Sequence, residues 1–191
     1  MILIYFLILI YVILIIFYVS YFFFGLFYGD TNRLIKYEHN GFKPKVSIVT
    51  ATFNEEKIIK NKLKNNLELS YPTNKLEFIF VDCSNDRTPE IITAFKGKNP
   101  SIDIKLIHEI ERSGLASALN LGYSSSTGDL VVKSDCDIIL RSDSIDHIVS
   151  FFENPIVGCV SGVGIADNDL EKSYRDIQIR LRIAESAFYS T

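Results

Sequence analysis

Residues 1–29 are an unbroken apolar run, and from residue 44 onwards short apolar segments alternate with helical patterns. The first run (MILIYFLILIYVILIIFYVSYFFFGLFYG) holds no charged side chain, and about 20 apolar residues are enough for a helix to span a bilayer. It lacks the basic start, the short apolar core and the small-residue cleavage site of a secretory signal peptide. We therefore predict a transmembrane anchor at residues 1–29.

The charges that flank this run predict its orientation. No Lys or Arg precedes it, whereas four basic residues follow closely: Arg33, Lys36, Lys43 and Lys45. Basic flanks stay on the cytoplasmic side of a membrane. We expect a single-pass protein of the cell membrane in which residues 30–43 are a linker and residues 44–191 form a cytoplasmic domain.

Four segments of this domain have the length and the β-branched or aromatic content of strands. They are residues 45–52, 76–82, 102–108 and 129–134. The third alternates apolar and polar positions, which is typical of a strand near a sheet edge. A short glycine-marked strand is also predicted at residues 157–163.

Helical patterns fill the intervals between these strands. Asn54 is expected to cap a helix that begins at Glu55, and Thr88 followed by Pro89 is expected to start the next helix. The first of these helices has an apolar stripe at four-residue spacing: Ile59, Leu63 and Leu67. Further helices are predicted at residues 114–124, from Ser142 or Asp143 to Phe152, and at about residues 170–188.

This alternation predicts an α/β fold with a mainly parallel, doubly wound, Rossmann-like sheet. Ligands of such sheets bind outside the carboxyl ends of the strands. No glycine-rich G-x-G-x-x-G or G-x-x-x-x-G-K-[ST] turn follows the first strand, so a dinucleotide cofactor and P-loop chemistry are disfavoured.

Three polar clusters fall at predicted strand ends, at residues 50–55, 82–86 and 135–137. In the last one, Asp135 and Asp137 are two residues apart, a spacing that points both carboxylates to the same side of a strand. Such carboxylates repel each other unless a cation or a donor-rich ligand lies between them. Mg²⁺ and Mn²⁺ suit such a site, since they take one or two carboxylates together with phosphate oxygens. The alternative is a pair of ordinary strand-end turn residues.

Composition excludes several other classes of function. The net charge of −3 and the lack of a long basic run give no footprint for nucleic acid. Cys83, Cys136 and Cys159 are odd in number and lack the paired spacing of a zinc or disulfide site, so they are expected to be small buried residues. His108 and His147 are expected to be surface or packing residues and not bases.

Four blocks now resemble the family 2 glycosyltransferases, which are inverting enzymes with the type A nucleotide-diphospho-sugar transferase fold. Residues 46–56 (VSIVTATFNEE) resemble the opening strand and "PTYNE" turn, and residues 78–88 (FIFVDCSNDRT) resemble "VVDDGSTDGT". Residues 112–122 (RSGLASALNLG) resemble "R-x-G-K-x-x-A-L-N-x-G", and residues 128–137 (GDLVVKSDCD) end in the family's Asp-x-Asp. The chain departs from the pattern at three places: Val81, Cys83 and Leu115.

The resemblance implies a role for each matching residue. Asp82 would recognise the base, typically uracil, while Thr50 and Thr52 would hold the nucleoside. Asp135 would bind the ribose, and Asp135 and Asp137 would hold a divalent Mg or Mn ion that bridges the diphosphate. The implied partner is a nucleotide-diphosphate sugar, with a UDP-sugar favoured.

Two further residues have open alternatives. Arg112 is either a phosphate contact, for which its planar fork is suited, or a solvated arginine at a helix start. Glu55 is either a ligand of the nucleotide sugar or an acid favoured by the dipole of the helix it opens.

No catalytic residue is assigned. Inverting transfer needs a general base, and the family's later aspartate and Q-x-x-R-W block are not found between Asp137 and Thr191. We therefore expect the donor half of a membrane-anchored glycosyltransferase, acting on a glycan or lipid-linked acceptor, without its acceptor half. The alternatives are a non-catalytic nucleotide-sugar-binding module that needs a partner subunit, and, more weakly, a nucleotidyltransferase.

Overall fold

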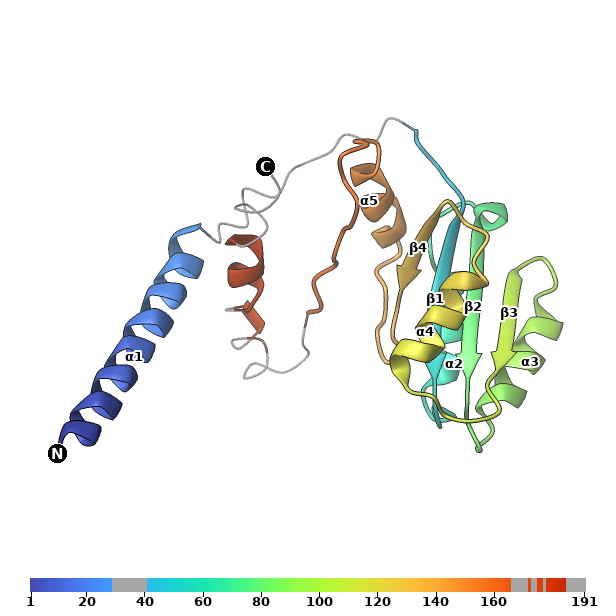
Figure 1. The fold of residues 1–191 in the computed structure, drawn as a ribbon. Coiled ribbons are helices and arrows are strands. Elements are labelled where there is room, and N and C mark those ends of the chain that lie inside the picture. Colours follow the sequence, from blue (N-terminus) through green and yellow to red (C-terminus); the bar gives the residue numbers. More distant parts are fainter. Residues whose placement is uncertain (29–40, 166–171, 173–174, 177, 185–191) are drawn as a thin grey trace. The chain divides into compact units, whose positions relative to one another are not determined.

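The computed structural model describes residues 1–28, 41–165, 172, 175–176 and 178–184 (Figure 1). The chain divides into two compact units, one of Met1–Lys36 with Ser161–Thr191 and one of Tyr37–Val160. The domain boundaries expected from the sequence, at residues 29/30 and 43/44, stay a prediction, and most of the expected linker lies outside the described residues.

Helix α1 (Ile2–Tyr28) is a single unbroken helix with almost all of its described side chains exposed. Its segment Ile2–Gly25, 24 residues, is long and apolar enough to cross a membrane. At 1.5 Å per residue it is about 36 Å long, which exceeds the roughly 30 Å of bilayer hydrocarbon. The predicted apolar helix therefore forms, and its orientation across a membrane stays a prediction.

The second unit is built on a four-stranded sheet whose neighbouring strands all pair in parallel. Its strands are β1 (Val46–Thr52), β2 (Leu76–Asp82), β3 (Asp103–His108) and β4 (Leu130–Lys133). Their order across the sheet is β3-β2-β1-β4. The predicted parallel α/β sheet is confirmed, with the third strand at an edge as its alternating pattern indicated.

Helices cover both faces of this sheet, as Figure 1 shows for α4 in front and α2 behind. They are α2 (Ile59–Leu67), α3 (Thr88–Lys98), α4 (Leu115–Ser124) and α5 (Ser144–Phe151), with a short 3₁₀ helix η2 (Thr73–Lys75) before β2. Side chains of α2, α3 and α5 join the core on one face, and α4 packs on the other.

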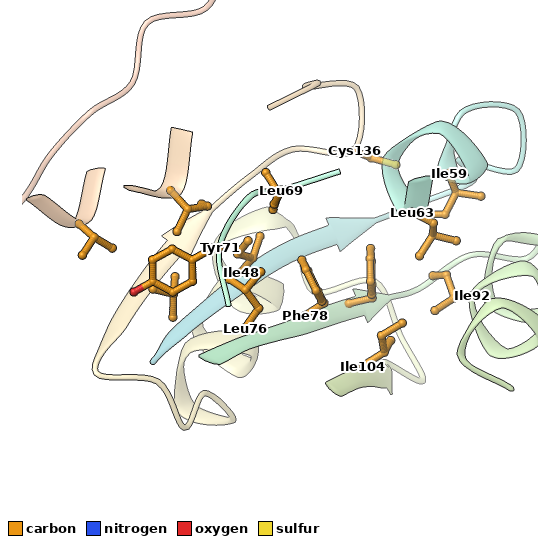
Figure 2. Close-up of a cluster of buried hydrophobic side chains, with 14 residues drawn as sticks. Ile48, Ile59, Leu63, Leu69, Tyr71, Leu76, Phe78, Ile92, Ile104 and Cys136 are labelled. Atoms are coloured by element: carbon orange, nitrogen blue, oxygen red, sulfur yellow. The ribbon is translucent and has the colours of Figure 1, made fainter. Parts of the chain in front are cut away.

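The strand side chains alternate between two apolar clusters. Ile48 and Phe78 lie in the larger one, with Ile59 and Leu63 of α2 (Figure 2). Val49 faces the opposite cluster, against α4. Each large side chain buried in this way contributes about 1.5–3 kcal/mol.

Helix α4 lies close to the sheet because it carries a glycine at its point of contact. A Cβ on Gly122 would lie 2.4 Å from the Cγ1 atom of Val49, which is closer than packed carbon atoms approach each other. Gly122 therefore sets how near α4 comes to β1 and β2.

A buried carboxylate near the amino end of β2 ties three strands together. Glu77 is fully buried and accepts hydrogen bonds from Ser47 of β1 and from the amide (2.9 Å) and hydroxyl (3.0 Å) of Thr127, which precedes β4. It also pairs with Lys105 of β3. Burial alone raises the pKa of Glu77, but the bonds from Lys105, Ser47 and Thr127 outweigh it and lower the pKa to about 2.

Four details of the sequence prediction are wrong. Of the three cysteines expected to be buried, only Cys136 is; Cys83 is half-buried and Cys159 is exposed. Helix α2 begins at Ile59 and not at Glu55, because Asn54 takes a left-handed φ of 58° and residues 55–58 form a turn. Leu67 is 45% exposed, because α2 turns polar side chains inward next to Leu63. Residues 157–163 form no strand; Gly158 and Gly162 leave that segment with little side chain to pack.

Two other helix predictions can be compared with the structure, the first of them only in part. The helix expected at residues 170–188 is helical at residues 178–184, and the rest of it lies mostly outside the described residues. Helix α3 starts at Thr88 and Pro89 as predicted, but its N-cap is Arg87, which makes no side-chain capping bond.

We predict that Glu77→Gln lowers the free energy of unfolding by about 1–3 kcal/mol, because it leaves buried partners without their carboxylate. The pKa of Glu77 is lowered on folding, so its stabilisation is present above about pH 4.5 and is lost as the pH falls toward 2. Thermal unfolding of the full chain in detergent, followed by circular dichroism at pH 7 and pH 4, measures both effects.

The matched control is Glu68→Gln, a change of the same kind at an exposed position just after α2. Equal unfolding midpoints for Glu77→Gln and the unaltered chain at pH 7 would show that this network does not stabilise the sheet.

Candidate functional site

The carboxyl ends of β2, β1 and β4 meet at one edge of the sheet, because these strands are parallel. Strand β1 lies between the other two. The chain runs outward from β1 to β2 and β3, then returns to place β4 on the other side of β1. Such a reversal of strand order leaves a crevice where open α/β sheets bind ligands.

Asp82, the last residue of β2, is fully buried at this edge. Its Oδ1 accepts hydrogen bonds from the hydroxyls of Thr52 (2.7 Å) and Ser84 (2.6 Å), and its Oδ2 accepts one from the Ser84 amide (3.1 Å). A carboxylate has about four acceptor positions. Three are therefore taken by the protein, and one on Oδ2 remains.

His108 faces that remaining position. It ends β3 opposite Asp82 in the strand register, and its Nδ1 lies 3.5 Å from Asp82 Oδ2. The sequence analysis assigned His108 to the surface, and its side chain is indeed 57% exposed. Its place at the end of a strand adjacent to β2 was the signal that links it to Asp82. An open depression of about 560 Å³ is lined by His108, Glu109, Ile110, Glu111 and Ser113.

Arg112 reaches across the end of β2. Its guanidinium carbon lies 3.9 Å from the centre of the Phe53 ring, which is the geometry of a cation–π contact. Phe53 follows β1, and Arg112 follows β3, so the pair spans the strand that ends in Asp82. Arg112 is exposed in this arrangement, and its contact with phosphate stays a prediction.

The loops after β1 and β2 are hydrogen-bonded to each other. The amide of Asn54 donates to the Ser84 hydroxyl (2.8 Å), and the Asn54 side chain accepts from the Asn85 amide (3.1 Å). Likewise, the amide of Glu55 donates to the Thr88 hydroxyl (2.9 Å). These bonds connect the loop that follows Asp82 to the turn that begins at Glu55.

Residues 134–142, here called the acidic loop, follow β4. The strand ends at Lys133, so Asp135 and Asp137 lie in a turn and not in the strand itself. Burial still alternates: Cys136 is buried, whereas Asp135 is half-buried and Asp137 is exposed. Lys133 donates to Asp135 Oδ2 at 2.9 Å. Both carboxylates therefore remain on the open side of the loop.

Negative charge accumulates where the acidic loop approaches the end of β1. Partial burial, together with the charges of Asp137 and Asp86, raises the pKa of Glu55. Burial raises the pKa of the Cys136 thiol to about 12, with Glu55 adding to the effect. Glu55 and Asp137 thus come close enough to repel each other, although the sequence places them 82 positions apart.

The donor set fits a hard divalent cation that shares its coordination with a ligand. In the described part of the chain, no three His, Cys, Asp or Glu side chains converge to hold a metal ion by themselves. Mg²⁺ and Mn²⁺ need only one or two protein carboxylates when phosphate oxygens supply the rest. Asp135 and Asp137 match that requirement.

Lys62 is a residue of this site that the sequence analysis missed. It belongs to α2 and is fully buried, and its Nζ donates to the Ser134 hydroxyl (2.5 Å) and to the Ile138 carbonyl (2.8 Å). Burial lowers its pKa to about 8, while the nearby Cys136, Asp135 and Asp137 act in the opposite direction. A lysine between two exposed lysines of an amphipathic helix gave no sequence signal of burial.

Thr50 lies deeper than the other predicted contacts. It is 1% exposed, and its hydroxyl has no hydrogen-bond partner among the described residues. Thr52 lies two residues nearer the carboxyl end and bonds to Asp82. The nucleoside contacts of both threonines stay predictions, and a direct contact by Thr50 would need its hydroxyl to be uncovered.

The comparisons with known proteins agree with this arrangement. The sequence model described as "Glycosyl transferase family 2" matches residues 47–189, which is most of the chain. The poly-beta-1,6-N-acetyl-D-glucosamine synthase of Staphylococcus aureus is 32% identical over 152 residues, covering 74% of this chain and 35% of that protein. The beta-monoglucosyldiacylglycerol synthase of a Nostoc species is 32% identical over 124 residues, covering 64% and 26%. The chain thus spans about a quarter to a third of these relatives.

A solved structure shares the fold. The mannosyltransferase PcManGT from Pyrobaculum calidifontis, determined in complex with GDP-Man and Mn²⁺, superposes with a TM-score of 0.70 and 30% identity, covering 90% of this chain and 50% of that one. The three-dimensional structure thus agrees with the family match of the sequence. This chain belongs to glycosyltransferase family 2.

Proposed function

We propose that this chain is the donor-binding part of a membrane-anchored glycosyltransferase, which transfers a sugar from a nucleotide-diphosphate donor, with inversion, to a glycan or lipid-linked acceptor. The observation that carries the proposal is that the loops after β2 and β4, which begin at Asp82 and before Asp135 and Asp137, lie at the same edge of the sheet on either side of β1. Strand β1 separates them, so at about 4.8 Å per strand they lie about 10 Å apart. A nucleoside diphosphate could span this distance, with its base at Asp82 and its diphosphate at Asp135 and Asp137.

Asp82 would receive the base. The acceptor position that His108 now faces at 3.5 Å suits an N–H donor such as that of uracil, and Thr52 and Ser84 hold the carboxylate in place. UDP is the favoured nucleotide by the resemblance of the block around Asp82. PcManGT was solved with GDP-Man, and guanine also carries N–H donors, so both nucleotides belong in any test.

The acidic loop would bind the diphosphate. A bound Mg²⁺ or Mn²⁺ would neutralise the charge that develops on the leaving diphosphate, an effect on the order of several kcal/mol. Asp135 and Asp137 would hold that ion, with Asp135 also near the ribose. Arg112, once released from Phe53, has the planar fork that phosphate oxygens accept. Glu55 lies close enough to Asp137 to contact the same ligand.

The acceptor and the location follow from the anchor and the relatives. Helix α1 is long and apolar enough to cross a bilayer, and the basic residues after it favour a cytoplasmic domain. The matched relatives are named as synthases of a polysaccharide and of a glycolipid, and both kinds of product suit an enzyme held at a membrane. Sugar transfer by this chain from UDP-GlcNAc, UDP-Glc or GDP-Man would exclude the alternative of a purely binding module.

We predict that Asp137→Asn weakens Mn²⁺-dependent binding of UDP or GDP at least about tenfold, or about 1.4 kcal/mol, because it removes a carboxylate ligand of the cation. Isothermal titration calorimetry of the full chain in detergent, with Mn²⁺ and with EDTA, measures the change. Asp103→Asn is the control, since Asp103 is a half-exposed acid at the amino end of β3, on the opposite edge of the sheet. If Asp137→Asn binds as tightly as the control, the acidic loop is not the diphosphate site.

We predict a different signature for Asp82→Asn. Loss of the charged acceptor for a base N–H costs about 1.5–3 kcal/mol, and the loss is expected equally with Mn²⁺ and with EDTA, because Asp82 does not hold the ion. The same titrations report it, and the unfolding midpoint shows whether the bonds to Thr52 and Ser84 survive. A folded Asp82→Asn variant with unchanged nucleotide affinity would remove Asp82 from the site.

A further inference from the structure

Helix α2 buries a polar face, which is unusual for a helix that packs on an apolar core. Lys62, Asn65 and Asn66 are all buried, whereas Lys60 and Lys64 of the same helix are exposed. Burying an ammonium group costs several kcal/mol unless its hydrogen bonds are remade. The buried ammonium of Lys62 must therefore have partners.

The partners of Lys62 and Asn65 are backbone and side-chain groups of the acidic loop, whereas the buried amide of Asn66 has no hydrogen-bond partner among the described residues. Lys62 donates to the Ser134 hydroxyl before Asp135 and to the Ile138 carbonyl after Asp137. Asn65 donates to the Leu140 carbonyl (2.7 Å) and accepts from the Leu140 amide (2.8 Å).

Just beyond α2, Ser70 continues the same row of contacts. Its amide and its hydroxyl each donate to the carbonyl of Ser142, both at 2.9 Å. The loop that carries both carboxylates is thus held at its start, its middle and its end by one helix and by Ser70, three residues beyond the end of that helix.

Stability alone does not explain this arrangement. Well-packed apolar residues usually stabilise a core as well as, or better than, a buried charge, and Cys136 and Ile145 already anchor the segment in the apolar core. Hydrogen bonds differ from apolar contacts in being directional. The bonds from Lys62 and Asn65 fix where the loop backbone lies, and hence where the two carboxylates between them point.

We propose that Lys62 and Asn65 are positioning residues that hold the acidic loop in the geometry in which Asp135 and Asp137 bind a diphosphate-bound cation. The inference rests on the proposed function and goes beyond it, since neither residue touches the nucleotide. Residues that orient metal ligands through a hydrogen bond typically change metal affinity by about 10–100-fold when they are removed.

The experiment compares Lys62→Met and Asn65→Ala with the unaltered full chain in detergent. Lys64→Met is the matched control, because it makes the same change at an exposed position of the same helix. For each protein, titration calorimetry with UDP and with GDP gives the affinity in Mn²⁺ and in EDTA. The ratio of the two affinities is the measured quantity, and the thermal unfolding midpoint is recorded alongside it.

We expect Lys62→Met and Asn65→Ala to reduce this ratio by about tenfold or more, to leave the affinity in EDTA within about twofold, and to leave Lys64→Met like the unaltered chain. A purely structural role would lower both affinities together and would not change the ratio. If Lys62→Met fails to fold, Asn65→Ala decides the question alone, since it removes no charge.

Two outcomes overturn the inference. One is a folded variant whose ratio equals that of the unaltered chain, or whose affinities fall equally in Mn²⁺ and EDTA; the proposed function then stands and only the positioning role fails. The other is an unaltered chain that binds neither nucleotide with Mn²⁺, in which case the proposed function fails and the positioning role fails with it.

Discussion

The parallel pairing of β1 with both β2 and β4 is the constraint on which the rest of this unit depends. It brings three segments that are far apart in the sequence to the same edge, and it leaves a crevice where the strand order reverses. An antiparallel β4 would send the acidic loop to the opposite edge. Because β1 has neighbours on both sides, its residues are nearly all buried, and the loops around it carry the polar chemistry.

The amino and carboxyl ends of the strands carry different arrangements of charge. Near the amino end, Glu77 is matched by donors from two strands and a turn, and its role is to join them. At the carboxyl end, one acceptor position of Asp82 is met only by His108 Nδ1 at 3.5 Å, and Glu55 and Asp137 repel each other. A site that binds a cationic or donor-rich ligand needs such unbalanced charge. The fully matched network at the other edge can offset the stability that this imbalance costs.

Much of this structure could be predicted from the sequence. Strands β1 to β4 follow from β-branched runs, and the clusters at their ends follow from the rule that ligands bind there. The order of the strands could not be predicted, because apolar pattern says nothing of which strands become neighbours. The approach of Glu55 to Asp137 and the link between Asp82 and His108 depend on that order. Lys62 was missed for another reason: a lysine reads as solvent-facing unless its partners, here in the acidic loop, are known.

The left-handed backbone at Asn54 has a mechanical consequence. Asparagine is among the few residues other than glycine that adopt this conformation readily, and here hydrogen bonds to Ser84 and Asn85 of the neighbouring loop hold Asn54 in it. Together with the bond from the Glu55 amide to Thr88, these bonds join the loop after β2 to the turn that contains Glu55. A displacement of either loop would therefore strain or break them.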